Sequence, residues 1–176
     1  MKFIETELKG AYIIELVPHR DHRGIFARAW CENEMREHWL SSRIAQINTG
    51  FSPKKGTLRG MHYQKAPRAE VKVVRCTKGA VYDVIIDLRP QSITHRKWVG
   101  VKLDDRNLRM IYVPEGFAHG YLTLEDDSEI YYLTSEFYSA QASAGVRYDD
   151  SAFGIEWPIS VDVISDADRL WPDYSI

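Results

Sequence analysis

Short apolar and β-branched segments alternate with polar turns along most of this chain. The pattern predicts strands over residues 11–17, 25–30, 44–51, 57–64, 71–76, 80–88, 98–103, 108–113, 118–124 and 129–137. Strands of about 5–9 residues, with turns roughly every 8–12 residues, are typical of an all-β sandwich or barrel. Because the strands do not alternate with helices, a doubly wound nucleotide-binding sheet is not expected.

One helix is predicted over residues 32–40, where acidic residues open the first turn and Met35, Trp39 and Leu40 recur at helical spacing. The segment from residue 138 onward is less periodic and is expected to wrap over the scaffold. A second helix start at residues 165–168 would hold Asp168 in a defined place. We therefore expect one domain over residues 1–176, with a barrel core over about 44–137 and a wrapping tail over about 138–176.

The composition excludes several classes of protein. The formal net charge of −2 gives no basic field for nucleic acid, so any anion must be bound by local Arg and Lys side chains. No apolar run approaches the ~18 residues of a membrane-spanning helix, and acids occupy the N-terminus where a signal peptide is apolar. Cys31 and Cys76 have no metal-type spacing and are expected as free thiols. These features predict a cytoplasmic protein without nucleic-acid or membrane partners.

The predicted strand over residues 57–64 carries the first candidate chemistry. Arg59 offers a cation to an anionic ligand, and His62 is available as a base near neutral pH. In a regular strand these two side chains point to opposite faces. For both to reach one pocket, we predict a bulge at Gly60 or a strand that begins at Arg59. An unbroken strand with the two residues on opposite faces would exclude a shared pocket.

Other candidate groups depend on which face of a strand they occupy. Lys72 shares a face with Val74 and points either into a polar interior or to water, and the pattern does not decide between them. Tyr131 and Tyr132 point to opposite faces, so that one of them can reach a pocket. Asp168 is the carboxylate expected behind an imidazole.

Residues 114–121 have the turn-then-strand arrangement of a cupin barrel, in which His119 points inward. Metal-dependent cupins use such a histidine together with an HxH pair and a carboxylate, whereas this chain has no second histidine two residues from His62. A metal site of His62, His119 and Glu70 is therefore an alternative interpretation. A module that binds nucleotide sugars without catalysis is another, although binding alone needs neither a base nor an acid.

Several longer motifs together resemble one family, that of dTDP-4-dehydrorhamnose 3,5-epimerase. They cover residues 58–64, 72–76, 83–89, 114–120 and 154–158, and the similarity runs in order from about residue 4 to residue 172. The resemblance implies a cupin jelly roll with one or two short helices, which uses neither metal nor cofactor and forms a homodimer. It also implies a nucleotide-diphosphate sugar substrate, a 4-keto-6-deoxyhexose inverted at carbons 3 and 5.

The resemblance further implies roles for individual residues. The catalytic set comprises His62 as base, Asp168 orienting it, Lys72 stabilising the enolate and Tyr132 as acid. The substrate-binding set comprises Arg23 and Arg59 for the diphosphate, Phe26 and Tyr138 for the nucleotide, and Gln46, Asn48 and His119 for the sugar.

The sequence departs from the family pattern in two places. Ala27 and Arg28 follow Phe26 where an acidic residue is usual, and Tyr148 stands where tryptophan is common. The first departure bears on nucleotide or sugar specificity, and neither touches the expected base, acid or lysine. A variant enzyme that inverts a single carbon is not separated from the double epimerase by the sequence.

Overall fold

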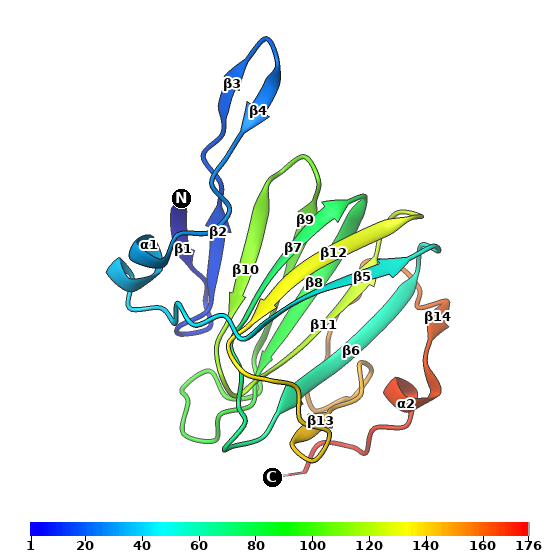
Figure 1. Ribbon diagram of the computed structural model, residues 1–176. Helices are drawn as coiled ribbons and strands as arrows, with labels where there is room; N and C mark the ends of the chain where they lie inside the picture. Colours follow the sequence, from blue (N-terminus) through cyan, green and yellow to red (C-terminus); the bar gives the residue numbers. More distant parts are fainter. Residues whose placement is uncertain (176) are drawn as a thin grey trace.

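The computed structural model describes residues 1–175, and two antiparallel sheets make up most of it (Figure 1). The first sheet has the order β1 (Lys2–Glu5), β2 (Tyr12–Glu15), β10 (Arg109–Val113), β7 (Lys72–Lys78), β12 (Ser128–Thr134), β5 (Gln46–Ser52). The second has the order β13 (Ser143–Gly145), β6 (Thr57–Gln64), β11 (Phe117–Thr123), β8 (Ala80–Asp87), β9 (Trp98–Asp104). The predicted all-β class is confirmed, and the architecture is a cupin jelly roll.

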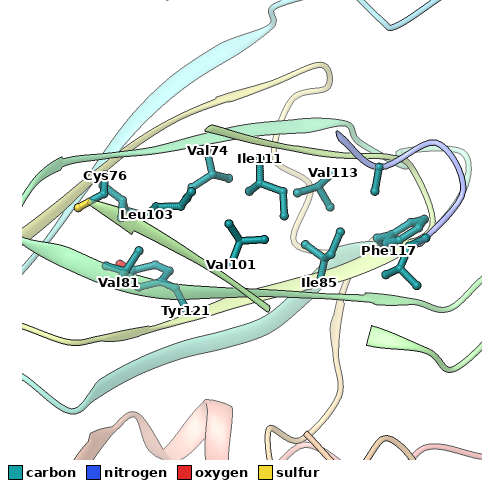
Figure 2. Packing of buried hydrophobic residues seen from close by; sticks show 13 residues of the cluster. Val74, Cys76, Val81, Ile85, Val101, Leu103, Ile111, Val113, Phe117 and Tyr121 are labelled. Atoms are coloured by element: carbon teal, nitrogen blue, oxygen red, sulfur yellow. The ribbon is translucent and has the colours of Figure 1, made fainter. Parts of the chain in front are cut away.

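The main core lies between the two sheets. Val74 and Ile111 of the first sheet face Val101 and Ile85 of the second, and all four side chains are buried (Figure 2). Strand alternation places every second residue of β7 in this interior, including Lys72 near the open end. The same fold that buries the valines therefore carries an ammonium group into the barrel.

The outer faces of the sheets are covered by the two ends of the chain. The helix α1 (Glu32–Glu37) packs Met35 onto the outer face of the first sheet. The C-terminal segment packs Phe153 against the outer face of the second sheet. It then adds β14 (Val163–Ile164), which pairs in parallel with β6, and the short helix α2 (Asp166–Arg169).

The strand predicted over residues 25–30 is wrong in its extent. Only β4 (Gly24–Phe26) is extended, and it pairs with β3 (His19–Asp21), which was not among the predicted strands. Residues 27–30 leave the strand because Ala27, Ala29 and Trp30 pack onto the apolar cluster under α1. The β3–β4 hairpin pairs with no other strand and projects away from the two sheets (Figure 1).

Two further elements differ from the sequence-based expectation. The predicted helix over residues 32–40 ends at Glu37, because Trp39 adopts a positive φ of 60° and its side chain is exposed while Leu40 is buried. The edge strand β1 was not expected, since its charged ends mask the pattern. β1 and β2 belong to the first sheet although they lie outside the barrel core expected over about residues 44–137. The division into a core and a wrapping tail stays a prediction. Among residues 1–175, no helix is long and apolar enough to cross a membrane.

Candidate active site

An irregularity in β6 lets Arg59 and His62 line the same cavity. The register between β6 and β11 shifts between these two residues. Gly60 has a φ of +140°, and a Cβ at this position would lie 2.5 Å from the Gly120 Cα. Only glycine allows the two strands to approach this closely. The bulge predicted at Gly60 is confirmed, and it removes the conflict between strand alternation and a shared pocket.

Two cavities, of about 530 Å³ and about 400 Å³, share the four expected catalytic residues as lining. These residues are His62 of β6, Lys72 of β7, Tyr132 of β12 and Asp168 of α2. The first cavity is also lined by Arg59, His119 and Tyr121, and the second by Gln46, Asn48, Tyr138, Glu70 and Trp171. The fold thus gathers nine of the eleven expected site residues around two cavities that share part of their lining.

The imidazole of His62 is paired with a buried carboxylate. Its Nε2 lies 2.6 Å from Asp168 Oδ1, and the Gly60 amide donates to Asp168 Oδ2 at 3.3 Å. The Asp168 amide in turn donates to the Oγ of Ser165, which caps α2. Burial raises the pKa of the Asp168 carboxyl. The hydrogen bond and charge of His62, together with the hydrogen bond from the Gly60 amide, outweigh burial and hold this pKa below its ordinary value. The negative charge of Asp168 stabilises the imidazolium that forms when the His62 ring accepts a proton.

The Lys72 side chain points into the barrel. The sequence had left open whether it faces the interior or water. Its Nζ lies 3.2 Å from Glu70 Oε1 and donates to the His62 carbonyl oxygen at 3.4 Å. The side chains of Lys72 and Glu70 are 10% and 11% exposed. A buried ammonium requires such a counter-charge.

Tyr132 and Tyr131 point to opposite faces of β12, as expected. Tyr132 lines both cavities, whereas Tyr131 is 40% exposed on the outer face of the first sheet. Burial raises the pKa of the Tyr132 phenol, the Glu70 charge raises it further, and Arg59 opposes both. Tyr132 therefore holds its proton at neutral pH and can donate it.

The polar groups around the two cavities are held by further contacts. His119 Nε2 lies 2.9 Å from the fully buried Asp83 Oδ2, which orients the imidazole toward the first cavity. The side-chain oxygen of Gln46 accepts a hydrogen bond from the Tyr138 amide at 2.6 Å, linking β5 to the segment after β12.

Arg23 and Phe26 are the two expected binding residues that this chain does not bring to its own site. Both lie on the β3–β4 hairpin, where Phe26 is 77% exposed and Arg23 pairs with Asp21 at 2.6 Å. Because the hairpin pairs only with itself, nothing folds it back onto the barrel. Nearby Arg28 pairs with Glu34 at 3.1 Å.

Two residues near the catalytic set were not predicted in that role from the sequence. Glu70 was considered only as a metal ligand, although its spacing of two residues from Lys72 places both on one face of an extended segment. Trp171 was not predicted as a site residue, yet its ring meets the His62 ring edge-on at 6.5 Å between centroids. Among the described residues, no group of three or more His, Cys, Asp or Glu side chains is arranged to hold a metal ion.

Comparisons with known proteins point in one direction. The family model for dTDP-4-dehydrorhamnose 3,5-epimerase matches residues 5–175. The curated dTDP-4-dehydrorhamnose 3,5-epimerase of Methanothermobacter thermautotrophicus is 41% identical over 173 residues, which cover 97% of this chain and 92% of that protein.

Solved structures agree with this. A crystal structure of dTDP-4-dehydrorhamnose 3,5-epimerase from Bacillus anthracis, with TDP and PPi bound, superposes with a TM-score of 0.95 at 37% identity, covering 98% of this chain and 99% of that one. A 3'-monoepimerase from Streptomyces bikiniensis, in complex with dTDP-quinovose, reaches a TM-score of 0.90 at 31% identity, covering 97% and 86%. The chain therefore belongs to the dTDP-4-dehydrorhamnose 3,5-epimerase family.

Proposed function

We propose that this chain is an isomerase that inverts carbons 3 and 5 of a nucleotide-linked 4-keto-6-deoxyhexose, converting dTDP-4-dehydro-6-deoxyglucose to dTDP-4-dehydrorhamnose. One observation carries the proposal. A carboxylate-paired imidazole, an ammonium group and a protonated phenol line the same two cavities. Base, charge stabiliser and acid are the three groups that epimerisation next to a ketone requires.

The reaction begins at a carbon beside the ketone, whose hydrogen the carbonyl group acidifies. His62 takes this proton, and the electrons of the broken C–H bond form an enolate whose negative charge lies on the former ketone oxygen. Lys72 stabilises that oxygen with its ammonium charge. Tyr132 then gives its proton to the same carbon from the other side, so that the carbon is inverted and the ketone restored. Exchange with solvent returns Tyr132 and His62 to their starting states.

The remaining residues of the two cavities bind the substrate in this proposal. Arg59 binds the diphosphate, for which a planar guanidinium is well suited. Tyr138 contacts the nucleotide, and Gln46, Asn48 and His119 contact the sugar. Gln46 and Asn48 lie on β5, Arg59 on β6 and Tyr138 after β12, and the buried His119 lies on β11.

We also propose that the enzyme is a homodimer, in which Arg23 and Phe26 of one subunit reach the site of the other. The β3–β4 hairpin is a projecting element with exposed apolar side chains at Ile25 and Phe26. β5 is an edge strand of the first sheet, and Ile47 and Phe51 on its outer face are also exposed. A second copy would cover these apolar groups and supply the two residues that a single chain keeps away from its cavities. The expected cytoplasmic location stays a prediction, which the free thiols of Cys31 and Cys76 favour.

A second candidate is an epimerase that inverts only one carbon. It is favoured by the similarity to the 3'-monoepimerase, whose fold this chain shares. Both candidates use the same base and acid, so the number of carbons that exchange is the distinguishing quantity.

The test is incubation of the purified protein with dTDP-4-dehydro-6-deoxyglucose in heavy water, followed by proton NMR. Loss of the signals at both carbon 3 and carbon 5 supports the double epimerase, and loss of one supports the single-carbon variant. His62→Asn should abolish exchange, while the control His38→Asn, on the surface after α1, should retain it. A wild-type protein that exchanges neither hydrogen would refute the proposed function.

A further inference from the structure

The site contains a buried carboxylate that the reaction steps above do not use. Glu70 lies just before β7, and its side chain is 11% exposed. It lines the second cavity together with Lys72 and Tyr132. Its Oε1 lies 3.2 Å from Lys72 Nζ, and its Oε2 accepts a hydrogen bond from the Gln64 side-chain amide at 3.4 Å. The carboxylate is thus held from both sides, next to the proposed enolate stabiliser.

The contacts of Lys72 explain what Glu70 does to this ammonium. A lysine ammonium has three N–H donors. Two of them have partners in the protein, Glu70 Oε1 and the His62 carbonyl oxygen, so that one is left for an oxygen of the substrate. Within residues 1–175, Glu70 is the single ion-pair partner of Lys72. It fixes the ammonium in place and offsets the cost of burying its charge.

Glu70 acts on Tyr132 through charge. A nearby negative charge disfavours a phenolate, and it adds to the effect of burial in raising the pKa of this phenol. Arg59 acts in the opposite direction. The charged and titratable groups that line the two cavities with Tyr132 are Arg59 and His62 of β6, Lys72 of β7, His119 and Tyr121 of β11, Asp168 of α2, Tyr63 and Tyr138, and Glu70.

We propose that Glu70 is a positioning residue for epimerisation, which orients the Lys72 ammonium in the cavity that both residues share with Tyr132. This inference rests on the proposed roles of Lys72 and Tyr132. Glu70 itself takes no proton from the substrate, since its carboxylate is engaged by Lys72 and Gln64. One largely buried carboxylate thereby holds Lys72 in place and adds a negative charge near Tyr132, the two groups that act after proton removal.

The test compares Glu70→Gln, Glu70→Asp and the control Glu129→Gln. Glu129 lies on the same strand as Tyr132, and its carboxylate accepts a hydrogen bond from Thr77 instead of facing the cavities. The measured quantities are kcat, KM and the pH dependence of kcat/KM for dTDP-4-dehydro-6-deoxyglucose, with thermal unfolding as a check of the fold.

For Glu70→Gln, kcat should fall by roughly 10- to 100-fold, the range expected when a reacting group is misplaced by about 1 Å. The alkaline limb of the profile should move to lower pH, because losing the negative charge of Glu70 favours deprotonation of Tyr132. Glu70→Asp keeps the charge but shortens the side chain, so kcat should fall while the alkaline limb stays in place. A merely structural role would not move that limb.

The outcomes separate this inference from the proposed function. If the wild type is active and Glu70→Gln has the same kcat and pH profile as the wild type and Glu129→Gln, the role of Glu70 is overturned. The proposed function is then unaffected. If Glu70→Gln does not fold, Glu70→Asp decides, and an unchanged kcat in that variant overturns the inference. If the wild-type protein exchanges no substrate hydrogen in heavy water, the proposed function is refuted, and the role of Glu70 is refuted with it.

Discussion

The Asp168 carboxylate lies 2.6 Å from Nε2 of His62, although 106 positions separate the two residues in the chain. The C-terminal segment brings them together because β14 pairs in parallel with β6, Val163 opposite Thr57 and Ile164 opposite Leu58. The Ser165 cap then starts α2 and turns Asp168 toward the imidazole. The tail therefore contributes the Asp168 carboxylate to the lining of both cavities.

Replacing this carboxylate should weaken the base. We expect Asp168→Asn to lower the rate of hydrogen exchange by roughly 10²- to 10⁴-fold, the contribution of a general base, because the amide no longer stabilises the imidazolium. The measurement is the loss of substrate proton signals in heavy water. Asp166→Asn, in the same helix but exposed, is the matched control. Equal rates for the two variants would contradict the pairing of His62 and Asp168.

Tyr132→Phe should separate proton removal from inversion. Without the phenol, His62 still removes the hydrogen, so exchange into the substrate continues while the inverted product falls by roughly 10²-fold or more. The control is Tyr131→Phe, one residue away on the outer face of the same strand, which should behave as wild type. NMR of the sugar protons follows both quantities in one sample. Inverted product at the wild-type rate from Tyr132→Phe would assign the acid elsewhere.

Gly60→Ala should damage both stability and activity. The added Cβ would lie 2.5 Å from the Gly120 Cα, in a backbone conformation that side chains rarely adopt. Gly154→Ala serves as the control, because its φ of +60° is also unfavourable but no atom lies within 4 Å of the new Cβ. We expect about 1 kcal/mol lost for Gly154→Ala and more for Gly60→Ala in chemical denaturation. Similar losses in the two variants would show that β6 and β11 can separate at no cost.

Asp87 should make the stability dependent on pH in the acid range. Burial raises the pKa of its carboxyl, but hydrogen bonds from Arg89, Ser92 and Thr94 outweigh burial and lower it to about 2. Since the folded-state pKa lies below the ordinary 3.8, the carboxylate stabilises the fold above that value, by about 2 kcal/mol. This contribution is lost as the pH falls through about 2.

Denaturation of Asp87→Asn at several pH values checks this expectation. The variant should be less stable than the wild type at pH 7, and the difference should narrow as the pH is lowered. The exposed Asp127→Asn should show no such trend. A difference that is independent of pH would mean that packing, and not the charge of Asp87, accounts for the loss.

Mixed dimers test whether the hairpin serves a partner. A chain with Arg23→Ala and Phe26→Ala and a chain with His62→Asn should each be inactive as homodimers. Refolded together, they form heterodimers in which one site has both an intact His62 and an intact hairpin. Random pairing would restore roughly a quarter of the wild-type activity. No recovery, with heterodimers present by mass spectrometry, would show that the hairpin does not act in the site of the partner subunit.

The sequence by itself determined the class of the fold and much of the site. The all-β class and the positions of most strands follow from alternating apolar residues, which is a local property of the chain. The bulge at Gly60 also follows from local chemistry, because Arg59 and His62 cannot share a pocket across a regular strand. The motifs that resemble the epimerase family named nine residues that the fold does bring around the two cavities.

Only the tertiary structure decided what depends on contacts between distant segments. Both orientations of Lys72 agree with strand alternation, and the buried Glu70 beside it is what makes the inward one stable. The pairing of β14 with β6 decides that Asp168 meets His62. The hairpin of Arg23 and Phe26 lies away from the barrel, since β3 and β4 pair with each other and with no strand of the two larger sheets. Such arrangements follow from the balance of burial, charge and hydrogen bonding across the whole fold, which no local pattern contains.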